Sequence, residues 1–163
     1  MAETGYTQMV KAYNDDPFTG HLSTPISDSG FTRAFIYNLP IYRKGLSPLG
    51  RGLEVGLAHG YFLVGPEVVF GTNRDFAADP YLAALLTAIA IVIIGTIGLN
   101  AHGLVSLKSA TECAPETDAM QTSEGWNLFA SGFFLGGTGS AFMAYFLLDK
   151  FSTIDAIFRG LVN

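Results

Sequence analysis

Apolar residues are concentrated in two long, uninterrupted runs in the second half of the chain. The runs cover residues 81–107 and 126–148, and neither contains an acidic residue, a lysine or an arginine. Each run exceeds the roughly 20 residues with which a helix crosses about 30 Å of hydrocarbon. Trp126 and Tyr145 stand near the ends of the second run, where aromatic residues typically lie at a membrane surface. The pattern predicts two transmembrane helices.

A third apolar stretch, residues 48–70, is interrupted by polar residues that include an arginine, a glutamate and a histidine. Its start is marked by Ser47, a favoured N-cap residue, and by Pro48, which suits the first helical position. We predict a third transmembrane helix here. The fold class is then an all-α membrane protein with three transmembrane helices, at about 48–70, 81–107 and 126–148, in a domain that covers 47–163.

Residues 1–46 form a polar arm before the first of these helices. Proline follows Asp16, Thr24 and Leu39 at three expected turns, yet apolar residues are too frequent for a purely disordered tail. We expect a surface-lying arm that packs on a partner protein and contains a short helix at 28–38. A flexible tail is the alternative. The N-terminal sequence has no apolar run, so we also expect no cleavable signal peptide.

Composition and charge agree with a membrane protein. Charged residues make up 14% of the chain, against about 25% in ordinary soluble domains. The net charge of −5 and the lack of a basic patch argue against a nucleic-acid partner. Lysine and arginine are most frequent before the first helix, which predicts an N-terminus on the cytoplasmic side of the membrane. Three crossings then place the C-terminus on the opposite side.

Two predicted helices carry small residues at every fourth position, which lets helix backbones approach closely in a membrane. The stripe in 48–70 consists of Gly52, Gly56 and Gly60, and the stripe in 126–148 consists of Gly132, Gly136, Ser140 and Ala144. We therefore expect the first and third helices to pack on each other.

Glu54 and His59 are the candidate ligand-binding residues of the first helix, because ionisable groups at membrane depth are functional candidates. A spacing of five residues places them about 140° apart around the helix, which favours two separate ligands over one shared ion. Two structural alternatives stay open. Glu54 can form a salt bridge with Arg51, three residues earlier, and His59 can be a buried histidine that bonds a backbone carbonyl.

His102 lies near the end of the second predicted helix, about 30 Å along it, whereas His59 lies about 16 Å into a helix that runs the other way. A single haem between the two histidines does not fit these depths. His102 either caps the helix end or binds a ligand of its own. Cys113 is the only cysteine, which excludes an internal disulfide and a cysteine-based metal site.

Long segments of the chain resemble the subunit XI (L subunit) family of photosystem I, in its cyanobacterial rather than its plant form. The segments are PFTGHLSTPISDS, NLPIYRKGLSPLGRGLEVGLAHGYFLVGPE and the C-terminal EGWNLFASGFFLGG and IDAIFRGLVN. The resemblance implies a non-catalytic, multi-pass protein of the thylakoid membrane, with a stromal or cytoplasmic N-terminus and a lumenal C-terminus. It implies bound antenna chlorophyll and carotenoid. The implied partners are the large reaction-centre subunits, neighbouring small membrane subunits, and copies of the chain in adjacent monomers of a trimer.

The resemblance also implies roles for individual residues. Glu54 and His59 match the glutamate and histidine that supply axial ligands to chlorophyll magnesium. Asp75 matches an aspartate that holds calcium at the trimer contact. His102 stands where an aromatic residue is usual and is a candidate ligand for a further pigment, and lipid is a further candidate cofactor.

Two other classes of protein share some of these features. A three-helix haem-binding anchor of a respiratory enzyme shares the size and topology, but it needs two histidines at one depth. A small transporter that uses Glu54 as a proton carrier would need polar partners in the other two helices, and their apolar faces offer almost none. An enzyme has little support, because no nucleophile–base pair or metal cluster is apparent.

Overall fold

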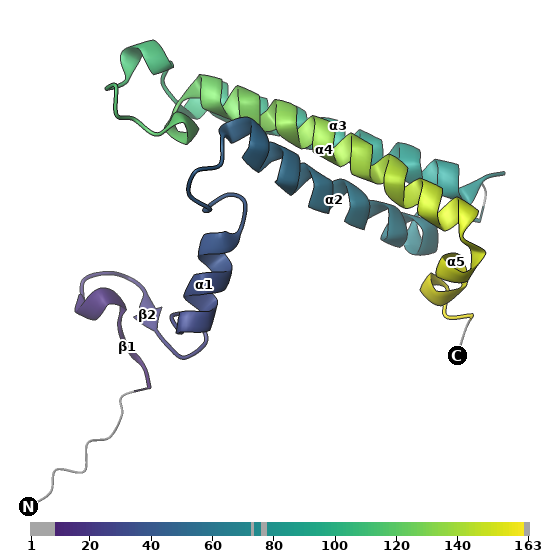
Figure 1. Cartoon of the computed structure of the whole chain (residues 1–163), viewed down its shortest axis with the longest axis horizontal. Coiled ribbons are helices and arrows are strands. Elements are labelled where there is room, and N and C mark those ends of the chain that lie inside the picture. The colour runs from purple at the N-terminus through teal and green to yellow at the C-terminus, as the bar shows by residue number, and fades with distance from the viewer. Residues whose placement is uncertain (1–8, 73, 76–77, 162–163) are drawn as a thin grey trace, which may run out of the picture. The chain divides into compact units, whose positions relative to one another are not determined.

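A computed structural model describes residues 9–72, 74–75 and 78–161, and most of them are helical (Figure 1). The predicted helical fold class is confirmed. The chain divides into two compact units, residues 1–44 and 45–163. Residues 1–8 of the predicted arm lie outside the described residues.

The N-terminal unit is built from short elements. They are β1 (Lys11–Ala12), the 3₁₀ turn η1 (Tyr13–Asp15), β2 (Leu22–Ser23) and α1 (Gly30–Asn38), with β1 and β2 antiparallel. Helix α1 corresponds to the short helix predicted at 28–38, and the hydroxyl of Ser29 caps it by accepting the Thr32 amide at 3.1 Å. Asp28 joins β2 to α1, because its carboxylate accepts the Ser23 hydroxyl at 2.7 Å and also pairs with Arg33.

The second unit contains three long helices. They are α2 (Pro48–Phe70), α3 (Pro80–Ser106) and α4 (Ser123–Lys150), followed by the short α5 (Ser152–Phe158). The predicted starts and ends agree with these bounds to within three residues. As predicted, the Ser47 hydroxyl caps α2, accepting the Gly50 amide at 3.1 Å, and Pro48 stands at its start. Helix α5 and the 3₁₀ turns η2 (Ala110–Glu112) and η3 (Ala119–Gln121) were not predicted.

Two helices of the described residues, α3 and α4, are long and apolar enough to cross a membrane. Helix α2 is not among them, although its 23 residues give a length of about 34 Å. The difference lies in composition, since α2 carries Arg51, Glu54 and Glu67. The membrane crossing of α2 therefore stays a prediction.

Helices α2 and α4 run side by side in the same direction, with α3 antiparallel to both (Figure 1). Gly52, Gly56 and Gly60 of α2 meet the α4 backbone one turn apart, and we call this contact the glycine seam. The predicted packing of the first and third helices is confirmed. Beyond the seam, towards the C-terminal end of α2, a cluster of aliphatic side chains fills the three-helix interface: Val64, Val68, Ala84, Leu85, Ala88, Ala141, Ala144 and Leu148.

The connection between α3 and α4 is held against the first turn of α4. The carboxylate of Glu124 accepts the Ser109 hydroxyl at 2.6 Å and the Ala110 amide at 2.8 Å. The Ser123 amide also donates to the Lys108 carbonyl at 3.0 Å. These bonds fix the ends of the loop that carries Cys113.

Candidate functional site

The glycine seam sets the position of the candidate ligands on α2. A Cβ added to Gly56 would overlap the carbonyl oxygen of Phe133 and lie 2.8 Å from the amide nitrogen of Gly137. Only glycine permits this approach of two backbones. The middle of α2 therefore lies against α4. Glu54 precedes Gly56 in the sequence, and His59 follows it.

His59 is oriented by two contacts. Its Nδ1 lies 2.8 Å from the carbonyl oxygen of Val55, one turn earlier. A carbonyl can only accept, so Nδ1 carries the proton, and in the neutral ring Nε2 keeps its lone pair. The ring also packs edge-to-face against Phe133 of α4, with centroids 5.8 Å apart. The carbonyl bond of the structural alternative is therefore present, but His59 is exposed rather than buried, and the bond leaves the other ring nitrogen able to bind a metal.

Glu54 is half-buried and lies on another side of α2. Its spacing from His59 remains about 140° in the regular helix, since α2 is continuous from Pro48 to Phe70. Arg51, one turn earlier, is buried and donates from Nε to the Leu46 carbonyl at 3.1 Å. The carboxylate of Glu54 can supply an oxygen ligand to a magnesium ion, and its salt bridge to Arg51 stays an alternative prediction.

His102 lies at the far end of α3 and packs against α4. Its ring centroid is 4.6 Å from that of Trp126, edge-to-face, and its Nδ1 is 3.3 Å from the Ser106 hydroxyl. The Trp126 indole in turn donates to the Met120 carbonyl at 2.7 Å. His102 is about 33 Å from the start of α3, whereas His59 is about 16 Å from the start of the antiparallel α2. The two histidines therefore lie at different depths of the bundle.

Asp75 lies in the connection between α2 and α3, with its side chain exposed and 2.9 Å from the Arg74 guanidinium. Arg74 also donates to the Val69 carbonyl at 2.9 Å. The part of the chain that the structure describes contains no group of three histidine, cysteine, aspartate or glutamate residues that could hold a metal. A calcium ion takes six to eight oxygens, so the described residues would supply only part of its ligands.

Comparison with known proteins decides the family. The sequence matches the family model of photosystem I reaction centre subunit XI over residues 9–153. The chain belongs to this family. It is 55% identical over 163 residues to subunit XI of Synechocystis sp., covering all of both chains. Identity to subunit XI of Trichodesmium erythraeum is 56% over 164 positions, covering 100% of this chain and 99% of the relative.

The similarity extends beyond these two relatives. Subunit XI of Cyanidioschyzon merolae is 48% identical over 146 residues, covering 90% of this chain and 99% of the relative. As a subunit XI, the chain is a non-catalytic membrane subunit of photosystem I, and the resemblance inferred from its sequence is confirmed. The haem-anchor and transporter alternatives are set aside by this membership.

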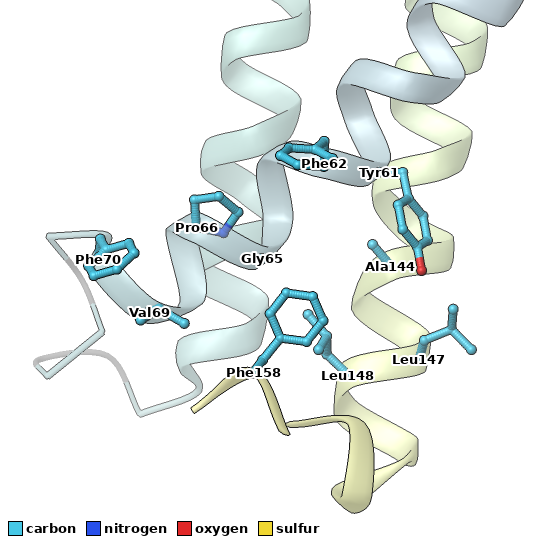
Figure 2. A pocket seen from close by; sticks show the side chains of 10 residues that line it. All are labelled: Tyr61, Phe62, Gly65, Pro66, Val69, Phe70, Ala144, Leu147, Leu148 and Phe158. Carbon is cyan, nitrogen blue, oxygen red and sulfur yellow. The ribbon is translucent and has the colours of Figure 1, made fainter. Parts of the chain in front are cut away.

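This subunit XI also contains an apolar groove that sequence reasoning missed. The groove has a volume of about 400 Å³ and lies between α2, α4 and α5 (Figure 2). It is lined by Tyr61, Phe62, Gly65, Pro66, Val69, Phe70, Ala144, Leu147, Leu148 and Phe158. Gly65 makes room for Phe158, whose ring would lie 3.1 Å from a Cβ added there. The signal in the sequence was weak, because the groove depends on the short helix α5.

Proposed function

We propose that the chain binds antenna chlorophyll and carotenoid in photosystem I and joins its monomers into trimers. The proposal includes three membrane crossings in the thylakoid membrane, with α2 as the first. The observation that carries pigment binding is the geometry of His59. An imidazole whose Nδ1 donates to the Val55 carbonyl presents an unprotonated Nε2, which is the form that binds a metal.

Chlorophyll magnesium supplies an open axial position, and residues on α2 fit it. His59 offers a nitrogen on the exposed side of the helix, and Phe133 of α4 limits the rotation of its ring. Glu54 offers a carboxylate oxygen on a different side of α2. Two macrocycles need two separate faces, which the 140° spacing provides. His102, already held against Trp126, is a candidate ligand for a third pigment.

The outer surface of α3 supports the presence of apolar partners. Ile94, Ile97, Leu104 and Val105 are all more than 60% exposed in the isolated chain. Such side chains on a membrane helix contact lipid, pigment or neighbouring subunits. We propose carotenoid and neighbouring small membrane subunits as the partners of this surface.

The N-terminal unit supplies a second surface for association. Phe31 and Phe35 lie one turn apart on α1 and are 81% and 60% exposed. A pair of exposed aromatic side chains on one helix face is typical of an interface. We propose that this unit lies on the stromal or cytoplasmic side and packs on the large reaction-centre subunits, with the C-terminus lumenal.

For trimer formation we propose a contact at the connection between α2 and α3. Asp75 would supply one oxygen to a calcium ion there, and neighbouring chains would supply the rest. Deleting the subunit should leave active monomers and no trimers on a sucrose gradient. Trimers that persist without the subunit would overturn this part of the proposal.

Pigment binding is tested in the purified photosystem I complex. His59→Leu should lower the chlorophyll content by one per copy of the subunit, because leucine offers no ligand atom, while the subunit itself is retained. His21→Leu, in the N-terminal unit, is the matched control and should change nothing. His102→Leu tests the third site in the same way. Unchanged chlorophyll in the His59 variant would show that this residue is not a ligand.

A further inference from the structure

A second, polar pocket lies next to the apolar groove at the C-terminal end of α2. It has a volume of about 340 Å³ and is lined by Val68, Val69, Arg74, Asp75, Arg159 and Leu161. None of the candidate pigment ligands on α2 lines either cavity. Two arginines from distant parts of the sequence line this one pocket.

The groove and the polar pocket are neighbours that share a lining residue. Val69 lines both of them, and its carbonyl accepts a hydrogen bond from Arg74 at 2.9 Å. Two consecutive residues also link the two cavities, because Phe158 lines the groove and Arg159 lines the polar pocket. The Arg159 guanidinium also lies 5.6 Å above the centre of the Tyr81 ring at the start of α3. An elongated ligand could therefore occupy both cavities at once.

The length of the groove matches half of a membrane. On α2 it extends from Tyr61 to Phe70, which is about 14 Å along the helix axis. The hydrocarbon layer is about 30 Å thick, so one leaflet accounts for about 15 Å. The groove thus reaches from the end of the helix, where Arg74 lies, to about the middle of the membrane. Figure 2 shows Phe70 and Phe62 at successive positions along this path.

Charge favours an anionic occupant. The polar pocket is lined by two arginines and one aspartate, and since Asp75 pairs with Arg74 at 2.9 Å, these side chains keep a net charge of +1. Guanidinium groups bind phosphate and sulfonate oxygens through paired hydrogen bonds. The apolar groove, by contrast, is lined almost entirely by hydrocarbon, as an acyl chain requires. A carotenoid would fill the groove but would not use the arginines.

We propose that the groove and the polar pocket together bind one anionic membrane lipid. An acyl chain lies in the groove, and the phosphate or sulfonate head group lies on Arg74 and Arg159. The inference goes beyond pigment binding and rests on the proposed function in one respect, namely that α2 crosses the membrane. It predicts a lipid that remains with the complex through detergent purification.

The test is the lipid content of purified photosystem I, measured by mass spectrometry per mole of protein. The double variant Arg74→Gln/Arg159→Gln should lose about one anionic lipid per copy of the subunit and retain its neutral galactolipids. Lys108→Gln removes a positive charge at the opposite end of the bundle and should keep the full anionic lipid content. Unchanged anionic lipid in the double variant would overturn the proposal.

A second variant tests the groove without changing charge. Leu147 is half-buried in its wall, so Leu147→Trp should fill the space and displace the same lipid. Loss of carotenoid with unchanged lipid would instead make the groove a carotenoid site. Loss of trimers with unchanged lipid would make it a contact with a second copy. Either result would refute the lipid site, whereas failure of pigment binding would appear separately, as unchanged chlorophyll in His59→Leu.

Discussion

Alanine in place of Gly136 tests whether the glycine seam holds α2 and α4 together. A Cβ at this position would overlap the carbonyl oxygen of Leu53 and lie 2.8 Å from the amide nitrogen of Leu57. Both atoms belong to the α2 backbone, which cannot rotate away as a side chain can. The methyl group is therefore accommodated only if the two helices move apart.

The magnitude follows from the contact distances. Relaxed contacts between heavy atoms lie at about 3.5–4.0 Å, and the added Cβ would lie far inside that distance from the Leu53 carbonyl oxygen, so the helices must separate locally by more than about 1 Å. A gap of about 1 Å already removes up to about half of the dispersion attraction across it. Overpacking in a close-packed interface typically costs about 1–3 kcal/mol. Alanine also gains about 1 kcal/mol over glycine through its higher helix propensity, which partly offsets this cost.

A control on the same helix separates the two effects. Gly139 lies three residues further along α4, and a Cβ added there meets no atom within 4 Å. Gly139→Ala gains the same helix propensity without the overlap, so the difference between the two variants is the packing cost alone. Gly98→Ala, on α3, is open in the same way and serves as a second control.

The assay is the temperature at which the subunit is released from purified photosystem I, followed on native gels. We expect release from Gly136→Ala at a temperature several degrees below that of either control. For a chain of this size the shift is about 2–4 °C for each kcal/mol. Equal release temperatures for Gly136→Ala and Gly139→Ala would show that the backbones are not in contact, and the account of the seam would be wrong.

Two further predictions concern the parts of the chain outside the three long helices. Hydrogen bonds from Arg33 and Ser23 lower the pKa of Asp28 from 3.8 to about 2. The stabilising effect of these bonds on α1 is therefore complete above pH 4 and is lost as the pH falls towards 2. Hydrogen exchange of α1 should show this pH dependence, and Asp28→Asn should abolish it. If α2 crosses the membrane, an impermeant maleimide labels Cys113 from the same face on which a protease cleaves the N-terminal unit. Labelling from the opposite face would mean that α2 does not cross.

The long helices could be predicted because each has a strong local signal. Ser47 and Pro48 mark the start of α2, and uninterrupted apolar runs define α3 and α4. The glycine spacing also predicted which two helices meet, since small residues at every fourth position have few other uses in a membrane helix. These features depend on residues that are close in the sequence.

The groove and its polar neighbour could not be predicted in the same way. Helix α5 has only seven residues and follows α4 after a single residue, Phe151, so the apolar pattern gives no separate signal for it. Arg74 and Arg159, which line the same pocket, are 85 residues apart in the sequence. The bond from His59 to Val55 was foreseen only as a structural alternative to metal binding. The assignment of the proton to Nδ1 required the distance.

The seam also explains why the two candidate ligands on α2 have different surroundings. Gly52, Gly56 and Gly60 span about 80° of the helix circumference, centred on Gly56. At 100° per residue, His59 lies about 60° from that centre, at the edge of the seam, where Phe133 of α4 packs against its ring. Glu54 lies about 160° from the centre, on the side facing away from α4. A ligand on His59 would therefore be positioned by this chain's own helix pair, whereas a ligand on Glu54 would depend on what lies on the side of α2 away from α4.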